Sequence, residues 1–267
     1  MIKILVPVDF SATSSNALRY AIQLFGASSL EVTLLHAFSS NPTTMTMKNI
    51  DDVIYKDSRH TMEGLIQRMQ KEFPDVTFNT KILSDHAVSC ITSLGNSGEY
   101  NFIVMGTKGA SGLKEVFLGS VAGGVISKTS APVLVVPDAH HFHHLDEVIL
   151  ALGDTTLTDT KVVDPLRHLA KLQKSKIKVL HISEKKTDTI EKTLADIKDL
   201  NPSVEYAFGT GNTNQDLHDY VTMNDSRLIC LIRGHKGFFN RLFKESVTLK
   251  QTFESHVPLL ILHDLSS

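Results

Sequence analysis

The sequence has few cysteines, little net charge and no long apolar run at its start. Cys90 and Cys230 are the two cysteines among 267 residues, and each lies in an apolar pattern, which favours reduced buried thiols over a disulfide framework or a metal site. A formal net charge of -2 provides no field that would attract nucleic acid or an anionic membrane. The apolar run from Met1 meets Pro7 and Asp9 too early for a signal peptide or a membrane span. We therefore expect a soluble cytoplasmic protein with neither nucleic acid nor membrane as a partner.

Short runs rich in Val, Ile and Leu alternate with longer segments of helical periodicity. This alternation is typical of parallel strands that crossover helices bury on both faces, so the sequence predicts an α/β fold. The elements expected in the first half are strands at 2–8, 31–37, 76–83, 101–105 and 133–136, with helices around 17–24, 47–72, 85–97 and 120–129.

The pattern then starts again. Four pairs of equivalent positions define the repeat: Asp9 and Asp154, His36 and His181, Ser120 and Ser246, and Pro132 and Pro258. The first two pairs are 145 residues apart and the last two are 126 apart, so the second copy lacks 19 residues, most economically within 39–60. The repeat predicts two domains, 1–138 and 146–267, each a mainly parallel five-stranded sheet flanked by helices.

A histidine-rich segment at 139–145 separates the two copies. It is polar, lies between strands and is too short to be a domain, so we interpret it as a linker. Clustered imidazoles could hold a transition metal, but a structural metal site usually needs ligands that a fold holds in place. We therefore expect a solvated linker and assign no metal site.

A glycine-rich loop follows the strand at 101–105 and leads into a helix at Ser120. Glycines bring backbone amides close to phosphate oxygens, and a helix N-terminus offers unpaired N–H groups and a favourable dipole. The loop is neither a Walker loop nor a dinucleotide fingerprint. From these residues alone, phosphate binding and a purely structural turn remain alternatives.

The spacing Gly106-x2-Gly109-x9-Gly119-Ser120 resembles the G-x2-G-x9-G-S/T signature of ATP-binding universal stress proteins. The segments 6–11, 34–37 and 131–137 are similar to the first, second and closing strands of that family, and the similarity runs along nearly the whole chain twice. The resemblance implies two adenine-nucleotide alpha-hydrolase-like (Rossmann-like) domains. It also implies that their last strands, 133–136 and 259–262, pair as an internal pseudo-dimer, while a homodimer of whole chains stays open.

The resemblance further implies a site for ATP, with Mg²⁺ on its phosphates, in the first domain. The implied binding residues are Pro7, Val8, Asp9, Ala37, Gly106, Thr107, Lys108, Gly109, Gly112, Gly119, Ser120 and Val121. The first three would lie along the adenosine, Ala37 would offer backbone groups to the adenine edge, and the others would hold the ribose and phosphates. Ala122 stands where family members often have Ser or Thr, so one phosphate-facing hydroxyl is missing.

Two polar residues near this site have competing interpretations. Asp9 precedes a helix start and would also serve as a turn or capping residue, so we assign it a mixed role. His36 lies in an apolar strand and is expected to be a hydrogen-bonded core residue rather than an acid-base catalyst.

The loop of the second copy departs from the signature. Gly234 and Gly237 keep the first spacing, but Glu245 stands in the place of Gly119 and follows a shorter loop. A carboxylate at that position would repel phosphate, so we expect no ATP site in the second domain. The apolar segment 238–243 is expected to cover the vacated pocket, with a surface for a partner as the alternative.

The resemblance thus implies a stress-response binding module that uses ATP as a regulatory ligand and has a protein partner of unknown identity. It shows no assembled nucleophile, base and metal, so we assign no catalytic residue and expect any ATP hydrolysis to be slow. A nucleotide-independent scaffold and a true ATPase are the alternatives.

Overall fold

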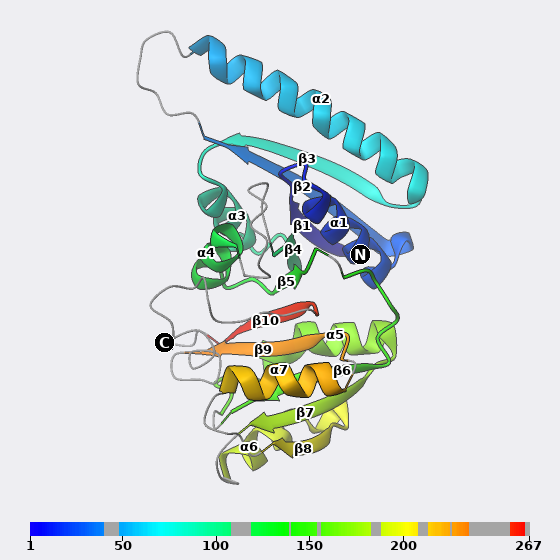
Figure 1. The fold of residues 1–267 in the computed structure, drawn as a ribbon, viewed down its shortest axis with the longest axis vertical. Coiled ribbons are helices and arrows are strands. Elements are labelled where there is room, and N and C mark those ends of the chain that lie inside the picture. Colours follow the sequence, from blue (N-terminus) through cyan, green and yellow to red (C-terminus); the bar gives the residue numbers. More distant parts are fainter. Residues whose placement is uncertain are drawn as a thin grey trace.

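The chain forms one long sheet with helices on both sides (Figure 1). The computed structural model describes residues 1–39, 48–107, 119–138, 140–153, 156–182, 188–207, 213–224, 226–234 and 257–264. In the first half the strands are β1 (Ile2–Pro7), β2 (Leu30–Phe38), β3 (Thr77–Ser84), β4 (Phe102–Gly106) and β5 (Val133–Val136). The helices of this half are α1 (Ala12–Phe25), the short η1 (Ala27–Ser29), α2 (Lys48–Glu72), α3 (Ala87–Gly95) and α4 (Ser120–Lys128).

The second half repeats the alternation of strands and helices. Its strands are β6 (Glu147–Leu152), β7 (Lys176–Ile182), β8 (Ser203–Ala207), β9 (Ile229–Gly234) and β10 (Leu259–Asp264). Its helices are η2 (Thr160–Val163), α5 (Asp164–Gln173), α6 (Asp188–Asp196), η3 (Lys198–Leu200) and α7 (Thr213–Met223). The predicted α/β class is confirmed, and each element expected in the first half is present. The observed ends lie within two residues of the expected ones except at the start of α1, which begins at Ala12 rather than near 17 because Ser11 caps it.

The order of the strands is symmetric about the middle of the sheet. It runs β3-β2-β1-β4-β5-β10-β9-β6-β7-β8, so each half has the same succession of strands, read in opposite directions. Neighbouring strands are parallel except β5 and β10, which run antiparallel with Leu260 opposite Leu134. The predicted pairing of the two closing strands is therefore confirmed.

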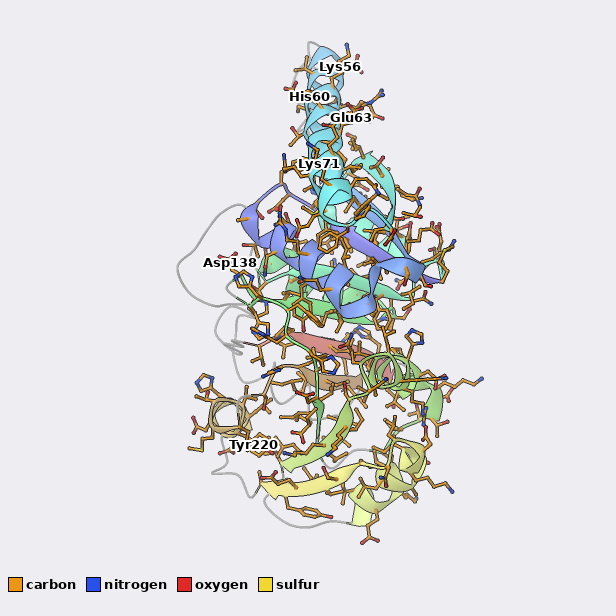
Figure 2. The ribbon with its side chains drawn as sticks, turned by 90° about the vertical axis from the view of Figure 1, so that its right-hand side faces the viewer. Lys56, His60, Glu63, Lys71, Asp138 and Tyr220 are labelled. Carbon is orange, nitrogen blue, oxygen red and sulfur yellow. The ribbon has the colours of Figure 1, made fainter. Side chains whose placement is uncertain are left out.

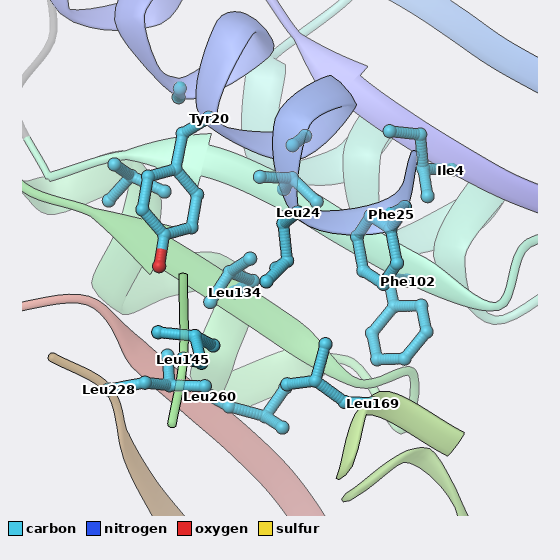
Figure 3. Packing of buried hydrophobic residues seen from close by; sticks show 14 of the residues in the cluster. Ile4, Tyr20, Leu24, Phe25, Phe102, Leu134, Leu145, Leu169, Leu228 and Leu260 are labelled. Atoms are coloured by element: carbon cyan, nitrogen blue, oxygen red, sulfur yellow. The ribbon is translucent and has the colours of Figure 1, made fainter. Parts of the chain in front are cut away.

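Two apolar cores lie on the two faces of the sheet. The helices α1, α2, α5 and α6 cover one face, and α3, α4 and α7 cover the other. Each core includes side chains of both β5 and β10, so it continues from one half into the other. Figure 3 shows the first core at this junction, where Tyr20 and Leu24 of α1 approach Leu134, Leu260 and Leu169 of α5.

The longest of the described helices, α2, covers the edge of the sheet with only part of its surface. Its buried side chains include Met62, Leu65 and Met69, whereas much of its remaining surface is polar. Figure 2 shows α2 standing out from the rest of the chain, with Lys56 and His60 near its outer end. Within the described ranges, no helix is both long enough and apolar enough to cross a lipid bilayer.

The segment between the halves lies against α1. Asn16 of α1 donates from Nδ2 to the carbonyl oxygens of Pro137 at 3.3 Å and His140 at 3.0 Å. Thr13 donates to Asp138 Oδ1 at 2.7 Å, and the side chain of Leu145 is fully buried. Parts of the predicted linker are thus held by α1 rather than simply solvated. Among the described residues, no three His, Cys, Asp or Glu side chains gather closely enough to hold a metal ion.

Candidate functional site

A cavity of about 380 Å³ opens at the carboxyl ends of β1, β2 and β4. Its volume lies within the range of small-molecule sites, about 300–1,000 Å³. β1 lies between β2 and β4, and the chain leaves β1 toward β2 on one side before it returns to β4 on the other. Ligands of open α/β sheets bind at such a switch point, beyond the carboxyl ends of the strands.

Nine of the twelve residues that the family resemblance implied line this cavity. They are Pro7, Val8, Asp9, Ala37, Gly106, Thr107, Gly119, Ser120 and Val121. The other three, Lys108, Gly109 and Gly112, lie outside the described residues. The sequence interpretation did not include the lining residues Ser14, Leu35, Ala87, Ile91 and Met105, which are ordinary helix and strand positions that only the fold brings together.

One wall of the cavity is the backbone of β2 beyond the end of its pairing with β1. The Val8 N–H donates to the Leu35 carbonyl at 2.8 Å, so the backbone polar groups of Leu35 face β1. Alternate residues of a strand turn these groups to the same side, and Ala37 therefore also faces the β1 side. Because the pairing of β1 with β2 ends at Pro7 and Leu35, the N–H and C=O of Ala37 point to the space beyond β1.

The turn between β1 and α1 carries the acidic residue of the cavity. Asp9 Oδ1 accepts hydrogen bonds from Ser11 N at 3.1 Å and from Ser11 Oγ at 2.5 Å. Ser11 is the N-cap of α1, since its Oγ accepts from Ser14 N at 3.2 Å. The predicted turn role of Asp9 is confirmed, whereas the capping side chain is that of Ser11. Asp9 thus both stabilises the turn and lines the cavity.

The start of α4 forms the opposite wall. The N-cap residue Gly119 has no side-chain cap, and its N–H donates to the Thr107 carbonyl at 2.6 Å, which holds the two described ends of the glycine-rich loop together. The first residues of a helix have backbone N–H groups without intrahelical acceptors, and here these residues, Ser120, Val121 and Ala122, line the cavity. The wall is therefore a donor-rich surface that suits an anion.

A buried hydroxyl adds a further polar group. Thr107 is 6% exposed, and its Oγ1 has no hydrogen-bond partner in the part of the chain that the structure describes. A buried hydroxyl without a partner costs about 1–3 kcal/mol. Since Thr107 lines the cavity, a polar ligand there could satisfy it.

His36 contacts the β1–α1 turn from β2. Its Nδ1 lies 2.8 Å from the Val8 carbonyl oxygen, and its ring centroid lies 4.5 Å from that of Phe10. The prediction that His36 is hydrogen bonded is confirmed, although the residue is only half-buried.

The corresponding strand ends of the second half are described only in part. Asp154, Gly237, the segment 238–243, Glu245 and Ser246 all lie outside the described residues. At the end of β10, the carboxylate of Asp264 accepts hydrogen bonds from the backbone N–H of Thr158 at 2.9 Å and from its hydroxyl. Asp264 thereby ties the end of this strand to the segment before η2.

Comparison with known proteins finds similarity along both the sequence and the fold. The family model of the universal stress protein family matches residues 1–137. Universal stress protein MJ0577 of Methanocaldococcus jannaschii is 30% identical over 155 residues, which cover 50% of this chain and 93% of that protein. Universal stress protein YxiE of Bacillus subtilis is 29% identical over 148 residues, which cover 50% of this chain and 97% of that protein.

A solved structure extends the similarity of fold to the whole chain. The crystal structure of a universal stress protein from Archaeoglobus fulgidus covers 98% of both chains with a TM-score of 0.72 and 20% sequence identity. At that identity the likeness concerns the fold alone. The match to the family model covers more than half of the sequence and therefore shows the family as well as the fold. The chain belongs to the universal stress protein family.

Proposed function

We propose that the chain is a tandem universal stress protein that binds ATP in the cavity of its N-terminal half and acts as a stress-response binding module. The observation that carries this proposal is the convergence of separate sequence motifs on one cavity. The ends of β1, β2 and β4 and the start of α4 all contribute to its lining.

The β2 wall suits the adenine base. Ala37 presents one N–H donor and one C=O acceptor side by side on the β1 side of the strand. Adenine carries the matching pair on its Watson–Crick edge, an N1 acceptor and an N6 amino donor. Guanine carries the opposite pair there, so this wall favours adenine over guanine.

The α4 wall suits the phosphates. The helix N-terminus offers backbone donors to an anion, and Gly119 allows a phosphate to approach the backbone closely. Mg²⁺ is usually bound by phosphate oxygens, waters and one or two carboxylates. Asp9 is the carboxylate among the described lining residues, so we expect Mg²⁺ to be held mainly by the phosphates.

The tandem arrangement is part of the proposal. We infer two domains, 1–138 and 146–267, joined by the segment 139–145 and paired as an internal pseudo-dimer. The symmetric order of the strands supports this, as does the whole-chain likeness to the Archaeoglobus fulgidus fold. Glu245 argues against a second ATP site. The two free buried cysteines are compatible with the reducing cytoplasm, where we place the protein.

Calorimetric titration with ATP, ADP and AMP tests the proposal. We expect one ATP site per chain and at least tenfold weaker binding in Gly119→Glu, which puts the carboxylate of the second copy into the first. Gly119 has a φ of -58°, so a side chain there does not strain the backbone. A carboxylate near a helix N-terminus interacts favourably with the helix dipole, so we do not expect this variant to unfold.

The matched control is Gly119→Gln, which has nearly the same size without the charge. A smaller loss of ATP affinity in Gly119→Gln than in Gly119→Glu would support electrostatic repulsion of the phosphates. Unchanged ATP affinity in Gly119→Glu would reject the site, and two equivalent ATP sites per chain would contradict the assignment of the second domain.

A further inference from the structure

The turn between β1 and α1 contains a backbone conformation that its residue does not favour. Phe10 has a φ of +63°, in the left-handed region that glycine, asparagine and aspartate tolerate best. For a bulky aromatic residue such a conformation costs free energy and persists only when its surroundings hold it. Phe10 directly follows Asp9, which lines the cavity.

Contacts from β2 hold this turn. His36 Nδ1 lies 2.8 Å from the Val8 carbonyl oxygen, and since a carbonyl only accepts, Nδ1 carries the hydrogen. The Val8 N–H is held as well, by the Leu35 carbonyl. On the other side of Asp9, the Phe10 ring rests on the His36 ring with 4.5 Å between centroids and 32° between planes. One imidazole therefore contacts both residues that flank Asp9.

The position of Asp9 indicates which part of a nucleotide it faces. β1 lies between β2, which carries Ala37, and β4, which leads to the phosphate-binding wall. A group on the β1 turn is thus placed between base and phosphates, where the ribose lies. A carboxylate only accepts hydrogen bonds, and the ribose hydroxyls can donate whereas the phosphates cannot.

We propose that His36 and Phe10 are positioning residues for the nucleotide, which together hold Asp9 toward the ribose hydroxyls. This inference rests on the proposed function, because it concerns the orientation of ATP in the same cavity. His36 acts through Val8 and Phe10, and it does not itself contact the ligand.

Binding of ATP and of 2′,3′-dideoxy-ATP to the intact chain tests the role of His36. The parent should bind ATP more tightly than the dideoxy analogue. In His36→Leu, ATP affinity should fall roughly tenfold, the effect of one lost hydrogen bond, while affinity for the analogue should change less than twofold. His36→Asn places an amide N–H where Nδ1 lies and should recover most of the ATP affinity.

A second pair of variants tests whether the backbone conformation of Phe10 affects the binding of ATP. Phe10→Asn and Phe10→Val both remove the ring, but asparagine tolerates a positive φ and β-branched valine does not. We expect Asn to bind ATP within threefold of the parent and Val to bind roughly tenfold more weakly, with the analogue unaffected. This pair decides the question if His36→Leu does not fold.

The outcomes separate the two proposals. Absence of ATP binding by the parent overturns the proposed function. If the parent binds ATP and the dideoxy analogue with equal affinity, the positioning role alone is overturned. The same holds if His36→Leu loses affinity equally for both nucleotides. Equal ATP affinity of Phe10→Asn and Phe10→Val has the same consequence.

Discussion

Gly106 ends β4 at a place where a side chain has no room. A Cβ there would lie 2.6 Å from Thr13 Cγ2 and 3.3 Å from the Thr13 carbonyl oxygen. Thr13 also donates to Asp138, so this contact joins the first glycine of the loop to α1 and to the segment after β5. The first glycine of the motif is therefore required for packing, whether or not phosphate approaches it.

His263 on β10 is expected to make the stability of the chain depend on pH. Burial, with a smaller contribution from the nearby positive charge of Arg233, lowers the pKa of His263 to about 4 from its usual 6.5. The unfolded chain therefore binds a proton between pH 6.5 and pH 4 that the folded chain does not. The free energy of unfolding should fall as the pH falls through this window, by about 3 kcal/mol at most.

Urea unfolding at pH 7.5, 6.0, 5.0 and 4.0 measures this dependence. The comparison variant is His263→Leu, which removes the titrating group and an imidazole whose two nitrogens have no partner among the described residues. The parent should lose stability relative to this variant as the pH falls. If the difference in free energy of unfolding between the parent and His263→Leu stayed constant from pH 7.5 to pH 4.0, the lowered pKa of His263 would be contradicted.

Sequence reasoning identified residues of the cavity that belong to spaced motifs and missed those that the fold supplies. Gly106, Gly119 and Ala37 were implied by the resemblance of the loop spacing and of the second strand to the motifs of the family. Ile91 and Met105 look like any other apolar residues of a helix and a strand, and only the crossing of α3 over the sheet turns them into lining. The positive φ of Phe10 had no signal, because an aromatic residue does not indicate a left-handed turn.

At the scale of elements, local chemistry largely determined where helices and strands end. The apolar spacing of α1 and the proline after α2 allowed both helices to be predicted. The packing between elements was harder to predict from the sequence. A Cβ at Gly124 of α4 would lie 2.9 Å from Val88 Cγ2 of α3, so the glycine allows the two helices to approach closely, a contact that depends on their positions over the sheet.

Substitution of Gly64 should stabilise α2. Gly64 lies inside this helix, and a Cβ there would have Arg68 Nη1 as its nearest neighbour at 3.8 Å, an ordinary contact. Alanine removes conformational freedom from the unfolded chain and has a higher helix propensity, so Gly64→Ala should raise the free energy of unfolding by about 0.5–1 kcal/mol. Urea unfolding monitored by circular dichroism measures the change.

Gly26→Ala is the matched control. A Cβ at Gly26 would have no atom of the described residues within 4 Å, but Gly26 ends α1 with a φ of +77°. The same substitution should therefore destabilise the chain by about 1 kcal/mol or more, because the backbone conformation disfavours a side chain. If the two substitutions changed stability in the same direction, available space rather than backbone conformation would govern both.

At the scale of the whole molecule, the two halves share their cores. The resemblance to universal stress proteins implied that the closing strands pair, and this pairing protects an edge of each half of the sheet. The contacts between helices of the two halves did not follow from the repeat. Gln173 of α5 donates from Nε2 to the Leu24 carbonyl of α1 at 2.5 Å, and both apolar cores run across the junction of β5 and β10.

The shared cores predict that the two halves unfold together. Each half has one cysteine, with Cys90 5% exposed on α3 and Cys230 fully buried on β9. Burial raises the pKa of both thiols, so neither should react quickly with a thiol reagent in the folded chain. Labelling in increasing urea, followed by mass spectrometry of the two peptides, reports the opening of each half separately.

Both cysteines should become reactive with the same urea midpoint, because losing one half would expose the apolar surface of the other.

If ATP binds as proposed, ATP at 100 times its dissociation constant should stabilise both cysteines against labelling by about 2.7 kcal/mol, although the cavity lies in the first half. Cys90→Ala and Cys230→Ala serve as controls that labelling at one cysteine does not alter the other. Local opening of α3 would expose Cys90 to labelling early and with little dependence on urea. If Cys230 instead became reactive at a different urea midpoint from Cys90 and ATP did not protect it, the continuous sheet would not couple the two halves.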